Sequence, residues 1–381
     1  MLLIQNGNLY LGGGRYEAGW DVLCDGKLIR AVGPGLSADG AEVIDAQGMD
    51  VYPGLVLGLC SVGAVSFSEF LSNQADHNES SAPILPHMDI CDAFDFRELK
   101  LQRFGRAGIT SYGLCPGTST LVAGQISLIH VDAPRASEVF VAKNIAVKGN
   151  YTNAAKGIFA PKGVFMTRMG MYQCLDAAFR AAKEYMEKDA KPYDACNEAM
   201  CRMLRGEVPF VVAAETAAEV EAVTRLGKKY GLRLVITGGF GAAEAAEEII
   251  ENGWHLMLGD SGNMGIGLKC EMEPEKLVEL YRKGLKLSLS CSGDVAYPPA
   301  YEQLLWMAAR MSAAGAQGHE LMDMMTIEPA RALGVEHLVG SIEAGKQADL
   351  IICRGNPAVR FDNYVERTIV AGRTCFERRG N

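Results

Sequence analysis

The middle of this chain alternates short apolar segments with amphipathic segments, and this alternation restricts its fold more than any other feature. Between the apolar runs 209–213 and 232–236, Thr216 and Glu219 form a capping box. Apolar residues follow at helical spacing until Gly231 ends the predicted helix. We predict eight strands in all, at 51–59, 109–114, 126–131, 143–147, 209–213, 232–236, 255–258 and 285–290. Strands that alternate with helices indicate an α/β protein with a parallel sheet, and eight strands favour a closed, TIM-like (β/α)8 barrel.

Both ends of the chain are instead rich in short strands and turns. Asp25-Gly26 is typical of a tight hairpin turn between two apolar runs. Residues 349–376 have the same character. We therefore predict a composite β-sandwich domain built from residues 1–52 plus 338–381, and a barrel domain over residues 53–337.

Composition narrows the class of protein. The 381 residues are 49% apolar and 22% charged, which is ordinary for a globular chain of this size. The net charge of −9 argues against nucleic-acid and anionic-membrane partners. The longest uncharged stretch, 51–68, is interrupted by proline and glycine, so it does not predict a membrane helix. Eleven cysteines without a Cys-x-x-Cys pair favour reduced thiols and a cytoplasmic location.

Two stretches resemble the amidohydrolase superfamily, in particular its imidazolonepropionase-like branch. Residues 43–54, ending in Pro53-Gly54, resemble the family's lead into the first barrel strand. Residues 326–334 and 340–350 resemble its return to the second half of the sandwich. The resemblance runs from end to end, and it implies a metal-dependent hydrolase fold with a split β-sandwich.

The resemblance also implies which positions should hold metal. Active members of the family bind one or two divalent metals at the carboxyl ends of the strands. The corresponding positions here include Leu59, Ser61, Ala213 and Gly238. The bridging ligand has no clear counterpart, and His130 and Lys148 are the nearest candidates. Because a zinc site needs three or four converging N, O or S ligands, we predict no ordinary metal site and no cofactor.

Polar residues that could bind a ligand nevertheless remain in the loops after the strands. Residues 76–79, 116–125 and 167–170 resemble loop motifs of the family. We predict that the ligand-binding residues are His77, Glu79, Gln125, His130 and Arg168. The alternative is that these residues attach a long loop to the barrel rim through hydrogen bonds.

Two carboxylates are the predicted catalytic residues. Glu215 and Asp294 would share general acid–base work if they lie close together and partly desolvated. The alternative is a pair of solvated carboxylates at strand ends or helix starts. Cys60, Cys115 and Cys291 also lie near strand ends, and we interpret them as buried packing residues rather than nucleophiles.

Together these features predict an amidohydrolase-like barrel that lacks the ordinary metal and binds a small polar or amino-acid-like molecule at its mouth. Such a protein could be catalytically silent, as a homodimer or paired with a related subunit. The alternative is a hydrolase of non-peptide carbon–nitrogen bonds, or a lyase or isomerase, with an unusual mechanism. An acid, base and nucleophile converging in one pocket would favour the enzyme.

Overall fold

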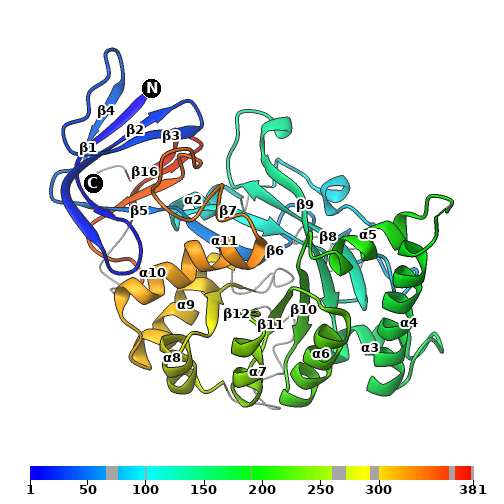
Figure 1. Ribbon diagram of the computed structural model, residues 1–381. Coiled ribbons are helices and arrows are strands. Elements are labelled where there is room, and N and C mark those ends of the chain that lie inside the picture. The colour runs from blue at the N-terminus through cyan, green and yellow to red at the C-terminus, as the bar shows by residue number, and fades with distance from the viewer. Residues whose placement is uncertain are drawn as a thin grey trace.

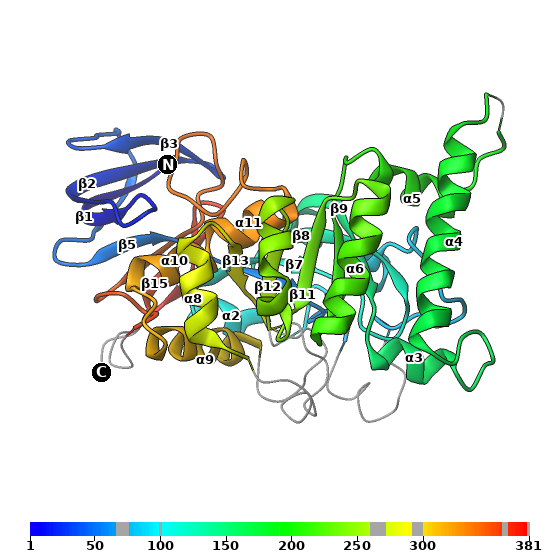
Figure 2. The same cartoon turned by 60° about the horizontal axis from the view of Figure 1, so that its bottom comes forward.

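The protein is built on two eight-stranded sheets, one formed by the two ends of the chain and one by its middle (Figure 1). The computed structural model describes residues 1–65, 76–98, 101–189, 191–259, 272–291, 300–359 and 365–378. In both views the terminal sheet lies on one side of the molecule and helices α3 to α6 lie on the other (Figures 1 and 2).

The terminal sheet has the strand order β16-β15-β14-β5-β1-β2-β3, with β4 paired to β1. Its strands are β1 (Leu2–Tyr10), β2 (Tyr16–Asp25), β3 (Leu28–Gly33), β4 (Glu42–Asp45), β5 (Asp50–Pro53), β14 (Leu350–Cys353), β15 (Val365–Val370) and β16 (Arg373–Glu377). Apolar side chains from both ends of the chain, such as Ile4, Val22 and Ile352, share one core. The sheet of the termini is therefore confirmed, while the domain boundaries at 52/53 and 337/338 stay a prediction.

The second sheet is a nearly closed barrel with the order β13-β12-β11-β10-β9-β8-β7-β6. Its strands are β6 (Leu55–Cys60), β7 (Ile109–Leu114), β8 (Val122–His130), β9 (Phe140–Asn150), β10 (Phe210–Ala214), β11 (Leu234–Gly238), β12 (His255–Leu258) and β13 (Lys286–Leu289). The two edge strands meet where Leu59 N–H donates to Ser290 Oγ at 3.0 Å. The predicted α/β barrel is confirmed.

One strand runs against the predicted direction. Strand β8 is antiparallel to both β7 and β9, whereas the other barrel ladders are parallel. The reason is the length of the connections: residues 115–121 and 131–139 are too short for the crossover of a dozen or more residues that a parallel pair requires. The expectation of eight parallel strands is therefore wrong for β8.

Helices surround the barrel sheet. They are α2 (Leu101–Arg106), α3 (Asn153–Phe159), α4 (Arg168–Met186), α5 (Ala195–Leu204), α6 (Ala217–Tyr230), α7 (Ala246–Glu251), α8 (Pro274–Arg282), α9 (Ala300–Ala313), α10 (Gly318–Met325) and α11 (Ile327–Leu333). Helix α6 begins with the predicted Thr216/Glu219 capping box and ends at Gly231, which is left-handed with φ +65°. Within the described residues, no helix is both long and apolar enough to span a bilayer.

The interior of the barrel has an apolar floor. Val56, Val211, Val235 and Met257, from four different strands, form one buried cluster with Leu333 of α11. Alternate residues along these strands, such as Phe210 and Val212, belong to a separate cluster that includes helix side chains. Side chains at i and i+2 share a face of a strand, so this alternation identifies which residues face the barrel interior.

The barrel and the terminal sheet are joined by a buried polar contact. His130, at the end of β8, lies with its Nε2 atom 3.1 Å from Asp349 Oδ2, and both side chains are 4% exposed. Asp349 Oδ1 also accepts from Ala371 N–H at 2.8 Å. Because β8 is reversed, His130 lies at the amino ends of the parallel strands, opposite the predicted mouth.

We predict that this contact stabilises the joint between the two sheets. The substitution Asp349→Ala leaves two buried groups without their partner, so the free energy of unfolding should fall by about 3 kcal/mol. Urea denaturation monitored by circular dichroism measures the change. In the control Asp25→Ala, the carboxylate is exposed and 3.9 Å from the exposed Arg30, so the loss should stay under about 0.5 kcal/mol. Equal losses in the two variants would contradict this account.

Candidate functional site

The carboxyl ends of β9, β10 and β11 are held in a continuous parallel register. Asn150 of β9 pairs with Ala213 of β10, which pairs with Thr237 of β11. Ala213 and Thr237 lie two positions beyond the interior residues Val211 and Val235, and Asn150 lies four beyond Ala146, so all three face the same interior. The register therefore brings the polar side chains of Asn150 and Thr237 to the end of the barrel where sites in this architecture are built.

Lys148 and Glu215 add opposite charges to this region. Lys148 lies on β9, two residues after the interior-facing Ala146, and only 1% of it is exposed. Glu215 directly follows β10 and is 6% exposed. Charged groups are almost never buried so completely without a structural or chemical reason. The second predicted catalytic residue, Asp294, lies outside the described residues.

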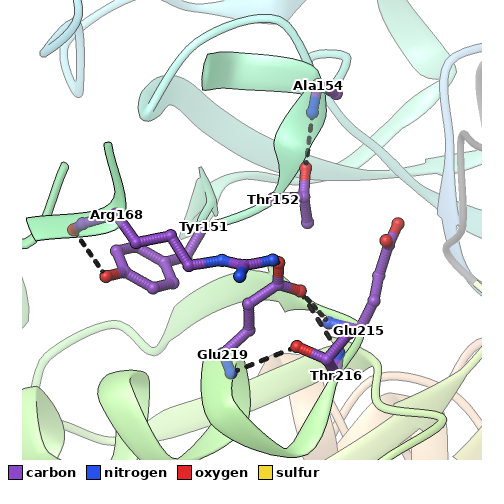
Figure 3. Close-up of polar contacts among 7 residues, drawn as sticks. All are labelled: Tyr151, Thr152, Ala154, Arg168, Glu215, Thr216 and Glu219. Atoms are coloured by element: carbon purple, nitrogen blue, oxygen red, sulfur yellow. Dashed lines mark hydrogen bonds and ion pairs between the residues drawn. The ribbon is translucent and has the colours of Figure 1, made fainter. Parts of the chain in front are cut away.

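Glu219 in the first turn of α6 organises the turn that carries Glu215. Its Oε2 atom accepts from the backbone N–H groups of Glu215 (3.0 Å) and Thr216 (3.2 Å). Its Oε1 atom accepts from Nε of Arg168 (3.1 Å), and Arg168 Nη2 completes the ion pair. Figure 3 shows the Glu215 side chain extending away from this pair.

Arg168 itself belongs to a helix start on the neighbouring connection. It is the first residue of α4, and its carbonyl accepts from the hydroxyl of Tyr151, which follows β9, at 2.9 Å (Figure 3). Its side chain is 42% exposed, while that of Glu219 is 1% exposed. The guanidinium that was predicted to bind a ligand thus pairs with a buried carboxylate of the protein.

His77 and Glu79 lie in a loop that packs on the connection between β7 and β8. Gly117 N–H donates to the carbonyl of His77 at 2.9 Å, and the Thr120 hydroxyl donates to the carbonyl of Glu79. The Asn150 amide donates to the carbonyls of Gly117 (3.2 Å) and Thr120 (2.7 Å). The predicted residues His77 and Glu79 are therefore joined to the end of β9. Their side chains differ, since His77 is buried and Glu79 is exposed.

Two predicted ligand residues lie elsewhere. Gln125 lies on β8 next to Ile126, whose side chain belongs to the interior cluster. Because successive side chains of a strand point to opposite faces, the side chain of Gln125 faces away from the interior. Its Oε1 atom instead accepts from Arg202 of α5 at 3.2 Å. His130 lies at the opposite end of the barrel, against Asp349. The structure therefore does not bring Gln125 and His130 together with Glu215, Arg168 and His77.

The positions expected to ligate metal carry side chains of a different chemistry. Leu59 is fully buried in the apolar interior cluster, and the Ser61 hydroxyl donates to the carbonyl of Cys115 at 2.8 Å. Ala213 is the next-to-last residue of β10, and Gly238 is the last residue of β11. Among the described residues, no three His, Cys, Asp or Glu side chains gather where they could hold a metal ion. The donor types at these four positions do not fit a zinc site.

The thiols near the strand ends are buried. Cys60, Cys115 and Cys291 are each at most 2% exposed, and Cys291 Sγ donates to the carbonyl of Leu59 at 3.6 Å. No cysteine in the described part of the chain forms a disulfide. Their burial is consistent with packing residues, because a reactive thiol needs solvent access and a neighbouring base.

Two residues of the site were not predicted from the sequence. Glu219 was identified only as half of a capping box, and its ion pair with Arg168 joins residues 51 positions apart. Asn150 lies beyond the predicted end of its strand, which the structure extends to Asn150. The one sequence feature that pointed to this part of β9 was the charged Lys148, directly after the predicted strand 143–147.

We predict that Glu219 fixes the turn that presents Glu215. Replacing Glu219 with Gln removes the anionic acceptor of two backbone N–H groups and of Arg168, and should lower the free energy of unfolding by about 2 kcal/mol. Glu221 lies on the same helix and is exposed, so Glu221→Gln should change stability by under about 0.5 kcal/mol. Thermal and urea unfolding of both variants tests this prediction. A Glu219→Gln protein as stable as the Glu221→Gln protein would refute it.

Solved structures with the same architecture include several hydrolases. An amidohydrolase from Thermotoga maritima MSB8 superposes with a TM-score of 0.89 at 26% identity, covering 99% of this chain and 100% of that one. A prolidase complexed with N-methylphosphonate-L-proline superposes with a TM-score of 0.59 at 18% identity, covering 99% and 100%. The second likeness shows the fold alone.

Comparisons of sequence agree with the fold. Amidohydrolase tasK of Hapsidospora irregularis is 24% identical over 387 residues, which is 90% of this chain and 39% of that protein. A dihydroorotase of Lactobacillus johnsonii is 50% identical over 54 residues, 14% of this chain and 12% of that one. The chain thus spans about two fifths or less of the length of these relatives. The model of the amidohydrolase family matches residues 150–375. The chain therefore belongs to the amidohydrolase family.

Proposed function

We propose that this protein binds a small, polar, amino-acid-like molecule at the carboxyl ends of its barrel strands, without the divalent metal of the family's active members. The observation that carries the proposal is the layering of the barrel interior. Asn150 and Glu215 lie beyond an apolar floor that includes Val211 and Val235, and the buried Lys148 lies level with Val211. A cavity with apolar walls and a few placed polar groups is typical of small-molecule sites.

The positions of the two charges favour a ligand with two polar ends. Val211 is the register partner of Lys148, and Glu215 follows Val211 by four residues, about 13 Å along an extended strand. A molecule with an anionic end near Lys148 and a cationic or amide end near Glu215 matches the arrangement. His77 and Glu79 are candidates for contacts at the rim.

The proposed absence of a metal rests on donor chemistry. Leucine, alanine and glycine supply no side-chain donor, and the hydroxyl of Ser61 is already directed at a backbone carbonyl. A polar site without that metal fits a binding protein, either alone as a homodimer or paired with a related subunit. The apolar floor would also make the ligand bind closer to the rim than a metal-bound substrate.

A second function, hydrolysis of a non-peptide carbon–nitrogen bond, is favoured by one observation. Glu215 is a buried carboxylate at a strand end, held by a turn that Glu219 fixes through two N–H contacts. A desolvated and oriented carboxylate is suited to general base catalysis. Several proteins of similar sequence or fold are named as amidohydrolases, a dihydroorotase or a prolidase. This alternative requires Glu215 to contact the substrate.

We predict that the purified protein carries well under one equivalent of zinc, iron or manganese. The physical reason is that Leu59, Ala213 and Gly238 cannot ligate a metal. Inductively coupled plasma mass spectrometry after dialysis without a chelator measures the content. One equivalent of metal that survives dialysis, and is lost in Glu215→Gln, would overturn the proposed absence of a metal site.

We predict that amino acids or N-acyl amino acids stabilise the protein. A ligand at a hundred times its dissociation constant adds about 2.7 kcal/mol to the free energy of unfolding, which a thermal-shift screen detects. Glu215→Gln keeps the backbone contact to Glu219 but removes the charge, and should weaken binding by at least about tenfold. Glu221→Gln is the matched control and should bind as the native protein does.

The same ligands distinguish the two functions. Binding without turnover, measured by calorimetry and mass spectrometry, supports the binding protein. Hydrolysis that persists in a chelator and disappears in Glu215→Gln supports the enzyme. Equal affinity in native protein and Glu215→Gln would contradict both roles of Glu215.

A further inference from the structure

A cavity lies at the amino ends of four adjacent barrel strands, away from the proposed ligand site. Its volume is about 710 Å³, and its lining includes Arg233, Trp254, His255, Lys286, Glu328 and Arg331. Arg233 and Trp254 immediately precede β11 and β12, and Lys286 begins β13. Glu328 and Arg331 come from α11. The volume lies within the range of small-molecule sites, about 300–1,000 Å³.

His255 gives this cavity a buried polar atom. The residue is 4% exposed, and its Nε2 atom forms no hydrogen bond within the described part of the chain. Burial, together with the charges of Lys286 and Arg331, lowers the pKa of His255 to about 3. The imidazole is therefore neutral at physiological pH, and its 3.9 Å separation from Glu328 is not an ion pair.

The rim of the cavity supplies positive charge. Arg233 and Lys286 are exposed, and within the described residues neither forms an ion pair with a carboxylate. They donate instead to the neutral carbonyls of Gly206 (3.3 Å) and Gly253 (2.9 Å). Each keeps further N–H donors, because a guanidinium has five and an ammonium three.

The register of the sheet places these groups beside one another. His255 pairs with Val235 on one side and with Lys286 on the other. Arg233 lies two residues before Val235. Arg331 pairs with Glu328 at 2.5 Å, so its charge is largely neutralised. Among the described residues that line the cavity, Arg233 and Lys286 are thus the cations without a carboxylate partner, beside one exposed carboxylate, Glu336.

We propose that this cavity binds a small molecule bearing an oxyanion group, a carboxylate or a phosphate. Arg233 and Lys286 neutralise the oxyanion, and the neutral ring of His255 lies in the wall of the cavity. The apolar wall, which includes Trp254 and Leu234, contacts the rest of the ligand. Such a site is independent of the molecule bound at the carboxyl ends of the strands.

Nuclear magnetic resonance of the full chain labelled with 15N-histidine tests this proposal. Inorganic phosphate and succinate are titrated separately at constant ionic strength, kept with sodium chloride. We expect a saturable shift of the His255 ring nitrogens with at least one of the two anions, which also distinguishes phosphate from carboxylate recognition. Arg233→Gln/Lys286→Gln should weaken that anion's binding by at least tenfold.

A matched control removes the same charges elsewhere. Arg15 and Lys183 are exposed and remote from this cavity in the sequence, so Arg15→Gln/Lys183→Gln should retain the native affinity. Equal weakening in the two double variants would show a general charge effect and overturn the proposal. A His255 signal that neither anion shifts would overturn it as well. Both double variants change exposed side chains only, so neither should disturb the fold. A variant of the buried His255 is therefore not needed.

Discussion

The parallel register of β9 to β13 is the constraint on which the rest of the structure depends. It places Asn150, Ala213 and Thr237 at one end of the barrel and Val235, His255 and Lys286 nearer the other. Because side chains alternate between the two faces of a strand, one register determines both the apolar floor and the polar positions above it. Both proposed sites follow from this single alignment.

The charged residues near the carboxyl ends of the barrel strands show how the fold supports a polar site whose carboxylates stay buried. Glu219 is buried, yet its carboxylate contacts two backbone N–H groups and the Arg168 guanidinium. Burying a carboxylate costs little free energy only when the carboxylate is paired and hydrogen-bonded in this way. The result is a fixed turn from β10 to α6, and Glu215 is presented by that turn.

The sequence predicted the elements of this fold better than their directions and contacts. Apolar periodicity identified all eight barrel strands and the capped helix α6, because burial and capping leave local patterns. Apolar periodicity does not reveal the direction of a strand, so the antiparallel direction of β8 was not predicted. The short connection at 115–121 was the sequence feature that indicated this direction. Because β8 is reversed, His130 lies at the amino ends of the parallel strands and not at the mouth, where it was predicted.

The candidate site was predicted only in part. Glu215 was identified from its place after a strand, but the Arg168–Glu219 pair depends on how α4 and α6 pack, which no local pattern encodes. Gln125 was assigned to the site from a loop motif, yet the alternation of β8 turns it toward Arg202. Such errors arise because the resemblance of a loop indicates the region in which a residue lies but not the direction in which its side chain points.

We propose that the carboxyl ends of the strands hold a polar ligand in the absence of a metal. Anomalous X-ray diffraction, at the zinc and manganese absorption edges, from crystals grown with both salts and an N-acyl amino acid, tests it most directly. We expect ligand density between Lys148 and Glu215 and no anomalous peak within bonding distance of the ends of β6, β10 and β11. An anomalous peak there, coordinated by side chains of this protein, would contradict it.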